Sequence, residues 1–251
     1  MKFTTGNTVV TFEKLWYLQR AHAERYVKSD HGTKILLMTK PILEVLKKRN
    51  WINSKNCVLG RHDAESYVTK LVQLDARNYT NASAFVERNK VFFQAPDEQT
   101  LLISRPSGHL HHISKDMSSV IHQDEVLQHT LSNLELIPPA EWTADQVREV
   151  INATIAEQTE LSLKFLDGSH YPGLEGHKKI FTKSWSKLVH GYIRWAIAAG
   201  LPGPDGAGSM QILGREETLN RFANAVRILG MKRPDGGADL KTKVAEAHKP
   251  A

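Results

Sequence analysis

The fold prediction rests mainly on Lys187–Ala225, KLVHGYIRWAIAAGLPGPDGAGSMQILGREETLNRFANA. Two segments of this stretch repeat apolar residues at three- and four-residue spacing, which is typical of amphipathic helices. They flank Gly200–Gly208, a loop with four glycines and two prolines. Gly200 is placed to end the first helix, and Pro202 and Pro204 prevent it from continuing. Periodicity alone therefore predicts a helical hairpin that packs on itself.

The second helix of this hairpin is expected to restart near Ser209 and to run on from Glu216 through Ile228. The residues after Gly214 are Arg-Glu-Glu-Thr-Leu. Acidic side chains in a first helical turn complement the exposed N–H groups and the helix dipole. The sequence therefore predicts a helix start directly after Gly214.

Helical periodicity recurs along the rest of the chain, so the sequence predicts an all-α fold. Pro41 requires a break or a new first turn within its segment. Thr143 and Gln146 have the spacing of a capping box, in which each satisfies a backbone donor of the other. Strand-like alternation is confined to Leu101–Ile103. The helix candidates are Phe12–Lys28, Lys34–Lys48, Arg61–Leu74, Asn81–Phe93, Ser118–Leu134, Thr143–Glu160, Ser184–Ala199 and Glu216–Leu229.

A polar, turn-rich segment that begins at Arg105 separates two helical halves. We expect a first helical subdomain at residues 1–104, a linker at 105–117 and a second helical subdomain at 118–230. Residues 231–251 contain few apolar side chains and several lysines, and we expect a disordered basic tail there.

The composition is moderately basic, with 33 Lys and Arg against 27 acidic residues and a net charge of +6. This surplus suits phosphate binding and is also common among ordinary basic proteins. The single cysteine, Cys57, excludes an internal disulfide and reads as a small, partly buried residue. No apolar run approaches the length of a transmembrane helix. Residues 1–10 have the features of neither a secretory signal nor a mitochondrial presequence.

The stretch quoted above also carries a specific series of motifs. Its parts are Arg194-Trp-Ala-Ile-Ala-Ala-Gly200, Gly203-Pro204 and Ile212-Leu-Gly-Arg-Glu216, followed by Arg221, Ala225 and Leu229. This series resembles the C-terminal signature of bacterial and mitochondrial-type glutamyl-tRNA synthetases. In that family an Arg-x-Ala-x-x-Gly segment precedes a Gly/Pro turn, then Leu-Gly-[Lys/Arg]-Glu and an Arg-rich final helix.

Two further stretches resemble the same family. Glu13–Ala23, EKLWYLQRAHA, is similar to the helix that opens its anticodon-binding region, and Tyr79–Pro96 is similar to its helix that ends in an aromatic pair before a proline. The resemblance implies an all-α anticodon-binding region whose partner is tRNA, in particular tRNA(Glu). It also implies a mitochondrial location, or otherwise a cytoplasmic one.

The catalytic half of that family holds ATP and Mg²⁺ with His-x-Gly-His and Lys-[Met/Leu]-Ser-Lys motifs. Neither string occurs in this sequence, where His109–His112 and Met38–Pro41 are the nearest but lack the required residues. We therefore expect no cofactor and no aminoacylation by this chain alone. A missing catalytic half or another protein partner is expected to accompany it.

Reading an anticodon requires arginine or lysine for phosphates and base edges, together with backbone that a base can approach closely. The resemblance places Arg194 at the anticodon, and Gly203 and Pro204 on the turn that contacts its bases. Glycine permits close approach of the backbone, and proline offers a flat apolar face. The alternative for Arg194 is a helix-surface arginine that extends past Trp195.

Further basic residues are candidates for contact with RNA. Arg77 lies where the family presents another anticodon-reading arginine, although Asn78 aligns equally well and a solvated role is equally open. A basic run with Trp185 interleaved leads into the signature helix, and such a run is usually a solvated face. The run consists of Lys178, Lys179, Lys183 and Lys187.

Other classes of function are less well supported. His109, His111 and His112 have no cysteine nearby and read as a polar loop rather than a metal site. Besides a tRNA-binding module, the chain could be a synthetase-derived scaffold for another RNA or protein, or part of an intact synthetase. An unrelated helical enzyme has no nucleophile, metal set or phosphate loop in its favour.

Overall fold

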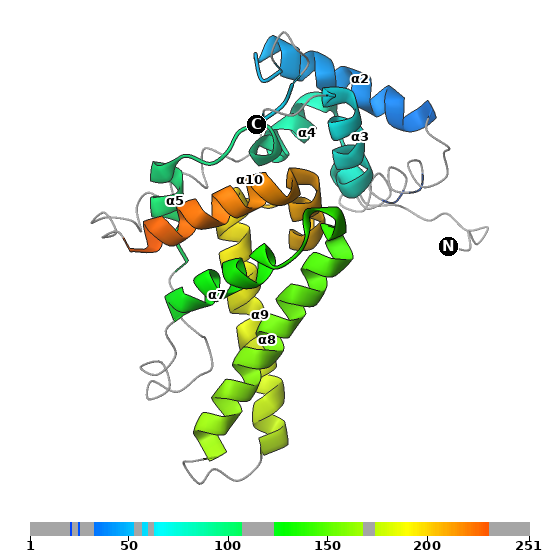
Figure 1. The fold of residues 1–251 in the computed structure, drawn as a ribbon. Coiled ribbons are helices and arrows are strands. Elements are labelled where there is room, and N and C mark those ends of the chain that lie inside the picture. The colour runs from blue at the N-terminus through cyan, green and yellow to red at the C-terminus, as the bar shows by residue number, and fades with distance from the viewer. Residues whose placement is uncertain are drawn as a thin grey trace, which may run out of the picture. The chain divides into compact units, whose positions relative to one another are not determined.

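The structure is a computed structural model in which every regular element of the described residues is a helix (Figure 1). The predicted all-α fold is therefore confirmed. None of these helices is both long enough and apolar enough to cross a membrane. The chain divides into two compact units, Met1–Gln94 and Ala95–Ala251. The described residues are 33–52, 57–59, 63–106, 123–167 and 174–230, together with Ala21 and Arg25.

In the first unit, helix α2 packs against α3 and α4 around a fully buried apolar centre that includes Leu46, Leu71 and Phe85. The helix predicted at residues 34–48 is present, and the one predicted at 61–74 is present from Ala64, since residues 61 and 62 lie outside the described residues. The one predicted at 12–28 lies outside the described residues, apart from Ala21 and Arg25. The elements of this unit are α2 (Thr33–Lys48), α3 (Ala64–Asp75), η1 (Ala76–Asn78), α4 (Ala82–Arg88) and η2 (Lys90–Phe92).

Two details of the first unit differ from the prediction. Helix α2 runs through Pro41 without the expected break. Proline removes the N–H that would bond to the carbonyl of Leu37, but both residues are exposed, so water can solvate that carbonyl. The helix expected at residues 81–93 is divided into α4 and η2 at Asn89, whose amide donates to the Phe85 carbonyl at 3.2 Å.

A buried carboxylate ties the end of α3 to α4. Asp75 is 2 % exposed and accepts hydrogen bonds from Asn78 Nδ2 at 2.6 Å, Arg88 Nε at 3.0 Å and Asn89 Nδ2 at 3.0 Å. A buried carboxylate is tolerated only when its oxygens are paired in this way. The polar cluster therefore fixes where η1 leaves α3.

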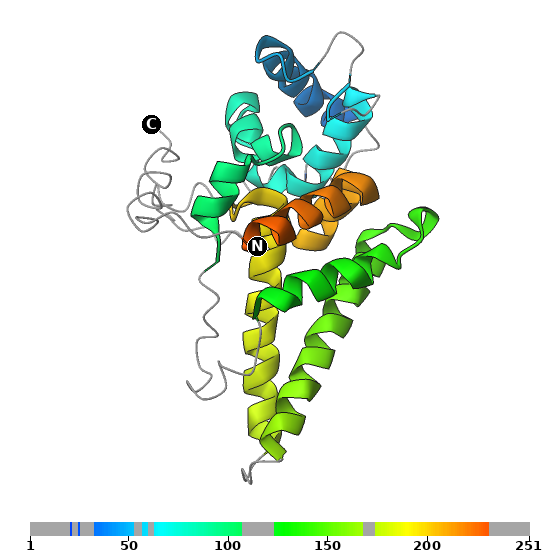
Figure 2. The ribbon, with the colours of Figure 1, turned by 60° about the vertical axis from the view of Figure 1, so that its left-hand side comes forward.

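In the second unit, the long helices α8 and α9 lie side by side as an antiparallel hairpin (Figures 1 and 2). Helix α10 packs on both of them and on α7. The elements of this unit are α5 (Glu98–Ser104), α7 (Gln123–Glu135), η3 (Pro139–Glu141), α8 (Ala144–Asp167), α9 (Leu174–Ala198) and α10 (Gly206–Leu229).

Two tryptophans anchor the core of this unit. Trp185 and Trp195 are each 1 % exposed, and each ring N–H has a partner. Trp185 donates to Ser162 Oγ on α8 at 2.9 Å, and Trp195 donates to the Leu101 carbonyl on α5 at 2.8 Å. Because a buried indole N–H requires an acceptor, these bonds fix the position of α9 against its neighbours.

The strand-like alternation at Leu101–Ile103 is wrong as an indication of a strand, because these residues belong to α5. Asp97 caps this helix by accepting from the Thr100 N–H at 2.7 Å. Helix α5 packs against α9 and α10, so the second unit begins at Ala95, whereas the sequence placed the first subdomain at residues 1–104. Most of the predicted linker, 105–117, lies outside the described residues, as does the predicted tail, 231–251.

The junction of α9 and α10 follows the sequence prediction closely. Helix α9 ends at Ala198, and the next two residues, Ala199 and Gly200, have positive φ angles of 51° and 78°. Asp205 then caps α10 by accepting from the Gly208 N–H at 2.9 Å. Helix α10 is interrupted at Gly214, with φ 72° and ψ 169°, so a new helical segment begins where the acidic residues predicted it.

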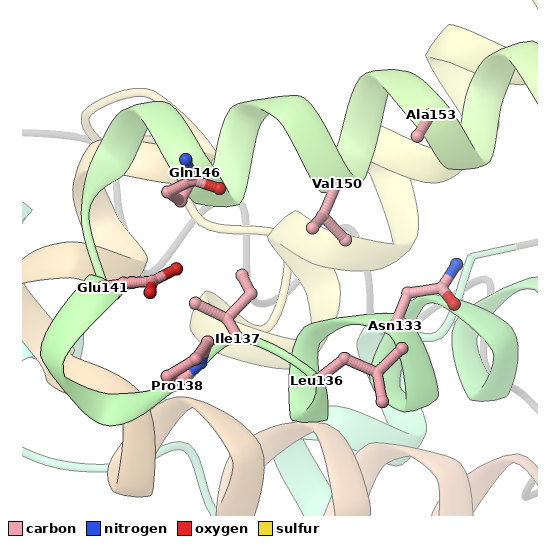
Figure 3. Close-up of a pocket in the computed structure, with 8 residues that line it drawn as sticks. All are labelled: Asn133, Leu136, Ile137, Pro138, Glu141, Gln146, Val150 and Ala153. Atoms are coloured by element: carbon pink, nitrogen blue, oxygen red, sulfur yellow. The ribbon is translucent and has the colours of Figure 1, made fainter.

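The predicted capping box of α8 forms only in part. The Gln146 N–H donates to Thr143 Oγ1 at 3.3 Å, as the prediction requires. The Thr143 N–H instead donates to the Glu141 carbonyl at 2.8 Å, because η3 brings that carbonyl close. The Gln146 side chain lines a groove beside η3 (Figure 3).

Candidate nucleic-acid interface

Three of the predicted site residues meet at the turn between α9 and α10. Arg194 is half-buried, and its guanidinium donates a hydrogen bond to the Pro204 carbonyl. A Cβ added to Gly203 would lie 3.0 Å from Arg194 Nη1, a tight contact, so a side chain there would require the guanidinium to shift by a few tenths of an ångström. Arg194 thus supports the turn as well as lying beside it, and it does not simply extend past Trp195.

A row of basic residues runs along α9 toward this turn. Lys179, Lys183 and Lys187 follow one another at four-residue spacing and are all exposed. Residues four apart lie on one face of a helix, about 6 Å apart along its axis. Within the described part of the chain, none of the three forms an ion pair. The row continues to His190 and ends at Arg194, and it is called the basic row below.

Within the basic row, the surroundings of His190 favour its uncharged form. Burial lowers its pKa below the usual 6.5, the nearby Arg194 guanidinium lowers it further, and Asp205 on the turn opposes this shift. The imidazole is therefore neutral at neutral pH. A neutral planar ring beside the turn can stack or share hydrogen bonds without adding to the positive charge.

Lys178 differs from the adjacent Lys179, because it forms an ion pair with a residue of α8. Its ammonium donates to Glu160 Oε1 on α8 at 2.8 Å. This hydrogen bond raises the pKa of Lys178 and lowers that of Glu160. Because both side chains are more than half exposed, the pair adds little to stability. Lys178 is therefore directed toward α8 and is not a member of the basic row.

Arg77 belongs to the first unit, whereas the other candidates belong to the second. It is exposed on η1, whereas its neighbour Asn78 donates to the buried Asp75. Of the two residues that could align with the family's arginine, Arg77 is therefore the one directed to solvent. Arg77 is the better candidate for contact with RNA, and Asn78 has a structural role.

Sequence reasoning missed the structural use of Arg215, which follows Gly214 in the signature. Its Nε donates to the Ile137 carbonyl at 2.9 Å, and Nη2 donates to the Glu135 carbonyl at 2.8 Å. Arg215 thus caps the C-terminal end of α7, whose last carbonyls lack partners within the helix. The sequence did hold one signal for this role, because Gly214 interrupts the helical periodicity directly before Arg215.

The described residues also bear on a metal site. No three of their His, Cys, Asp and Glu side chains are grouped closely enough to hold a metal ion. His109, His111 and His112 lie outside the described ranges.

Comparisons with known proteins give one remote likeness. No family model and no curated protein matches the chain. Among solved structures, it is similar to a glutamate tRNA ligase from Elizabethkingia meningosepticum, which was crystallised with its amino acid. The two are 16 % identical, with a TM-score of 0.48, over 83 % of this chain and 31 % of that one. This chain therefore spans about a third of the length of the solved protein.

Proposed function

We propose that this chain is an RNA-binding module for tRNA, as the resemblance to the anticodon-binding region of glutamyl-tRNA synthetase implies. The observation that carries the proposal is the basic row on α9, which leads to the Arg194–Pro204 turn. Lysines in a row can follow a phosphate backbone, and a glycine–proline turn lets unstacked bases approach closely. Recognition of tRNA(Glu) is the finer form of the proposal.

The two parts of this interface are expected to act differently. Lysine contacts with phosphates strengthen binding to any RNA and make it salt-dependent, because they release counterions. A guanidinium at the turn can donate to the edge of a base and so distinguish one anticodon from another. Arg77 is expected to add a further contact from the first unit.

The phosphate role is tested by a pair of adjacent lysines. Lys179→Ala is expected to lower affinity for tRNA(Glu) and for a loop-scrambled version alike, and to reduce the salt slope by about one unit. Lys178→Ala is the matched control, because its ammonium already pairs with Glu160, and we expect a smaller change. Fluorescence anisotropy of a labelled anticodon stem-loop, measured over a range of salt concentrations, gives both quantities. Equal slopes for both variants and the unmodified chain would contradict a phosphate-binding row.

The reading role is tested at Arg194. Arg194→Ala is expected to reduce the preference for the glutamate anticodon over a scrambled loop by about ten-fold, within the range for one base contact. Arg194→Lys can still donate to Pro204 but lacks the planar fork, so it separates support of the turn from base reading. Gly203→Ala crowds the guanidinium without removing it, so we expect a smaller loss of preference than for Arg194→Ala. An unchanged preference in folded Arg194→Ala protein would remove this residue from the site.

A further inference from the structure

A shallow groove of about 360 Å³ lies between the end of α7, η3 and the first half of α8 (Figure 3). It belongs to the second unit and is not part of the basic row. Leu136, Ile137 and Pro138 form one side, and Val150 on α8 faces them. The groove is therefore apolar along most of its length.

Leu136 makes the groove unusual. It is 79 % exposed, more than any other large hydrophobic residue in the described ranges. A single exposed leucine is ordinary, but here it adjoins other apolar groups in a concave surface. Covering this surface would remove Leu136 and Val150 from water together.

Hydrogen bonds to α10 hold the walls of the groove in place. Arg215 on α10 donates to the carbonyls of Glu135 and Ile137, on either side of Leu136. At the other end of the loop, Trp142 Nε1 donates to the Met210 carbonyl at 3.1 Å. Both anchors lie in α10 near its interruption at Gly214. Because the loop is fixed before any ligand arrives, binding need not order it.

The one charged side chain among the described residues that line the groove is acidic. Figure 3 shows the Glu141 carboxylate directed toward the middle of the groove, near the Gln146 amide. In the described part of the chain no lysine or arginine lines the groove, although the Arg215 guanidinium bonds to the backbone of its wall. Exposed Glu135 and Glu149 adjoin its lining residues in sequence. The chain carries a net charge of +6. A carboxylate directed into an apolar groove favours a cationic ligand over an anionic one.

We propose that this groove binds a segment of a partner protein in which an aliphatic side chain lies next to Lys or Arg. The aliphatic side chain would pack against Leu136 and Val150, while the cation pairs with Glu141. The apolar wall supplies contact area and the carboxylate selects positive charge. Small binding grooves commonly combine an apolar lining with a few polar groups that give specificity. This site is independent of the proposed binding of RNA.

The probe for the test is the peptide acetyl-KLKL-amide, titrated into the ¹⁵N-labelled full chain and followed by amide NMR shifts. We expect shifts centred on residues 136–150 and a Kd of about 1 mM, as suits so short a ligand. Acetyl-ELEL-amide and acetyl-KGKG-amide, which lack the charge or the aliphatic groups, are expected to bind at least about five-fold more weakly.

Variants of the chain locate the site. Glu141→Gln should weaken binding of acetyl-KLKL-amide by about three-fold, as expected for an exposed ion pair. Leu136→Ser should weaken it by about ten-fold without changing the unfolding midpoint, because the side chain is already exposed. The matched controls are Leu37→Ser and Glu44→Gln, both exposed on α2, and they should leave binding unchanged.

Any one of three results with the peptides would overturn the proposal. These are no saturable shift at several times the expected Kd, equal binding of the acidic peptide, and equal loss of binding in the α2 controls. Self-association of the chain in sedimentation, abolished by Leu136→Ser, would assign the groove to a second copy instead and would equally overturn the proposal.

Discussion

Arg221→Met is expected to lower the free energy of unfolding by about 3 kcal/mol, because it removes one partner of a buried ion pair. The Arg221 side chain is 4 % exposed, and its Nε donates to Glu217 Oε1 at 2.6 Å. Its Nη1 donates to the Ile197 carbonyl on α9 at 2.7 Å. Methionine fills similar volume but leaves the Glu217 carboxylate, 23 % exposed, without this cation. Urea unfolding followed by circular dichroism measures the loss.

The same helix offers a matched control for this prediction. Arg227 Nη2 pairs with Glu98 Oε2 at 2.6 Å, and both side chains are about half exposed. Arg227→Met should therefore cost only about 0.5 kcal/mol, the usual value for a surface pair. Adding Glu217→Leu to Arg221→Met should recover part of the loss, because the unpaired charge is then gone. Equal losses for Arg221→Met and Arg227→Met would show that burial does not set the contribution of Arg221.

The sequence predicted helices well where local chemistry decides them. Gly200 follows the end of α9 and a new helical segment begins after Gly214, as the sequence predicted from local signals. Helix α10 itself begins at Gly206, slightly before the predicted restart near Ser209, because Asp205 caps it. Sequence prediction failed where a residue distant in the sequence determines the local structure. Leu101 alternates like a strand residue, but its carbonyl accepts from Trp195, 94 residues away, and its segment is helical. The burial of Arg221 and Asp75 follows the same rule, because it depends on contacts with the Ile197 carbonyl, 24 residues away, and with Arg88, 13 residues away.

Part of the candidate site could also be foreseen from the sequence. The motif suggested Arg194, Gly203 and Pro204, and the structure brings these three together. Spacing alone could place Lys179, Lys183 and Lys187 on one face, but it could not show that Lys178 pairs with Glu160 across the hairpin. Contact with RNA, the specificity for tRNA(Glu), the absence of aminoacylation by the chain alone and a mitochondrial location remain predictions.

Gly214 joins the fold of α10 to the capping of α7, and its φ of 72° with ψ of 169° is a conformation that only glycine adopts readily. Gly214→Ala is therefore expected to lower the free energy of unfolding by about 1–3 kcal/mol through backbone strain. If α10 relieved this strain by straightening, Arg215 would lose its bonds to Ile137 and Glu135. Each such hydrogen bond contributes about 1 kcal/mol. Straightening α10 would therefore reduce the loss of stability only slightly.

The control for Gly214→Ala is Gly191→Ala, in the interior of α9. Gly191 is exposed, and a Cβ there would meet nothing within 4 Å. Alanine should therefore stabilise the chain by about 0.5–1 kcal/mol, since glycine loses more backbone entropy on folding. The two glycine-to-alanine changes are thus expected to shift the urea midpoint in opposite directions. A stabilising Gly214→Ala would contradict the interruption of α10, because in a continuous helix this glycine would respond to alanine as Gly191 does.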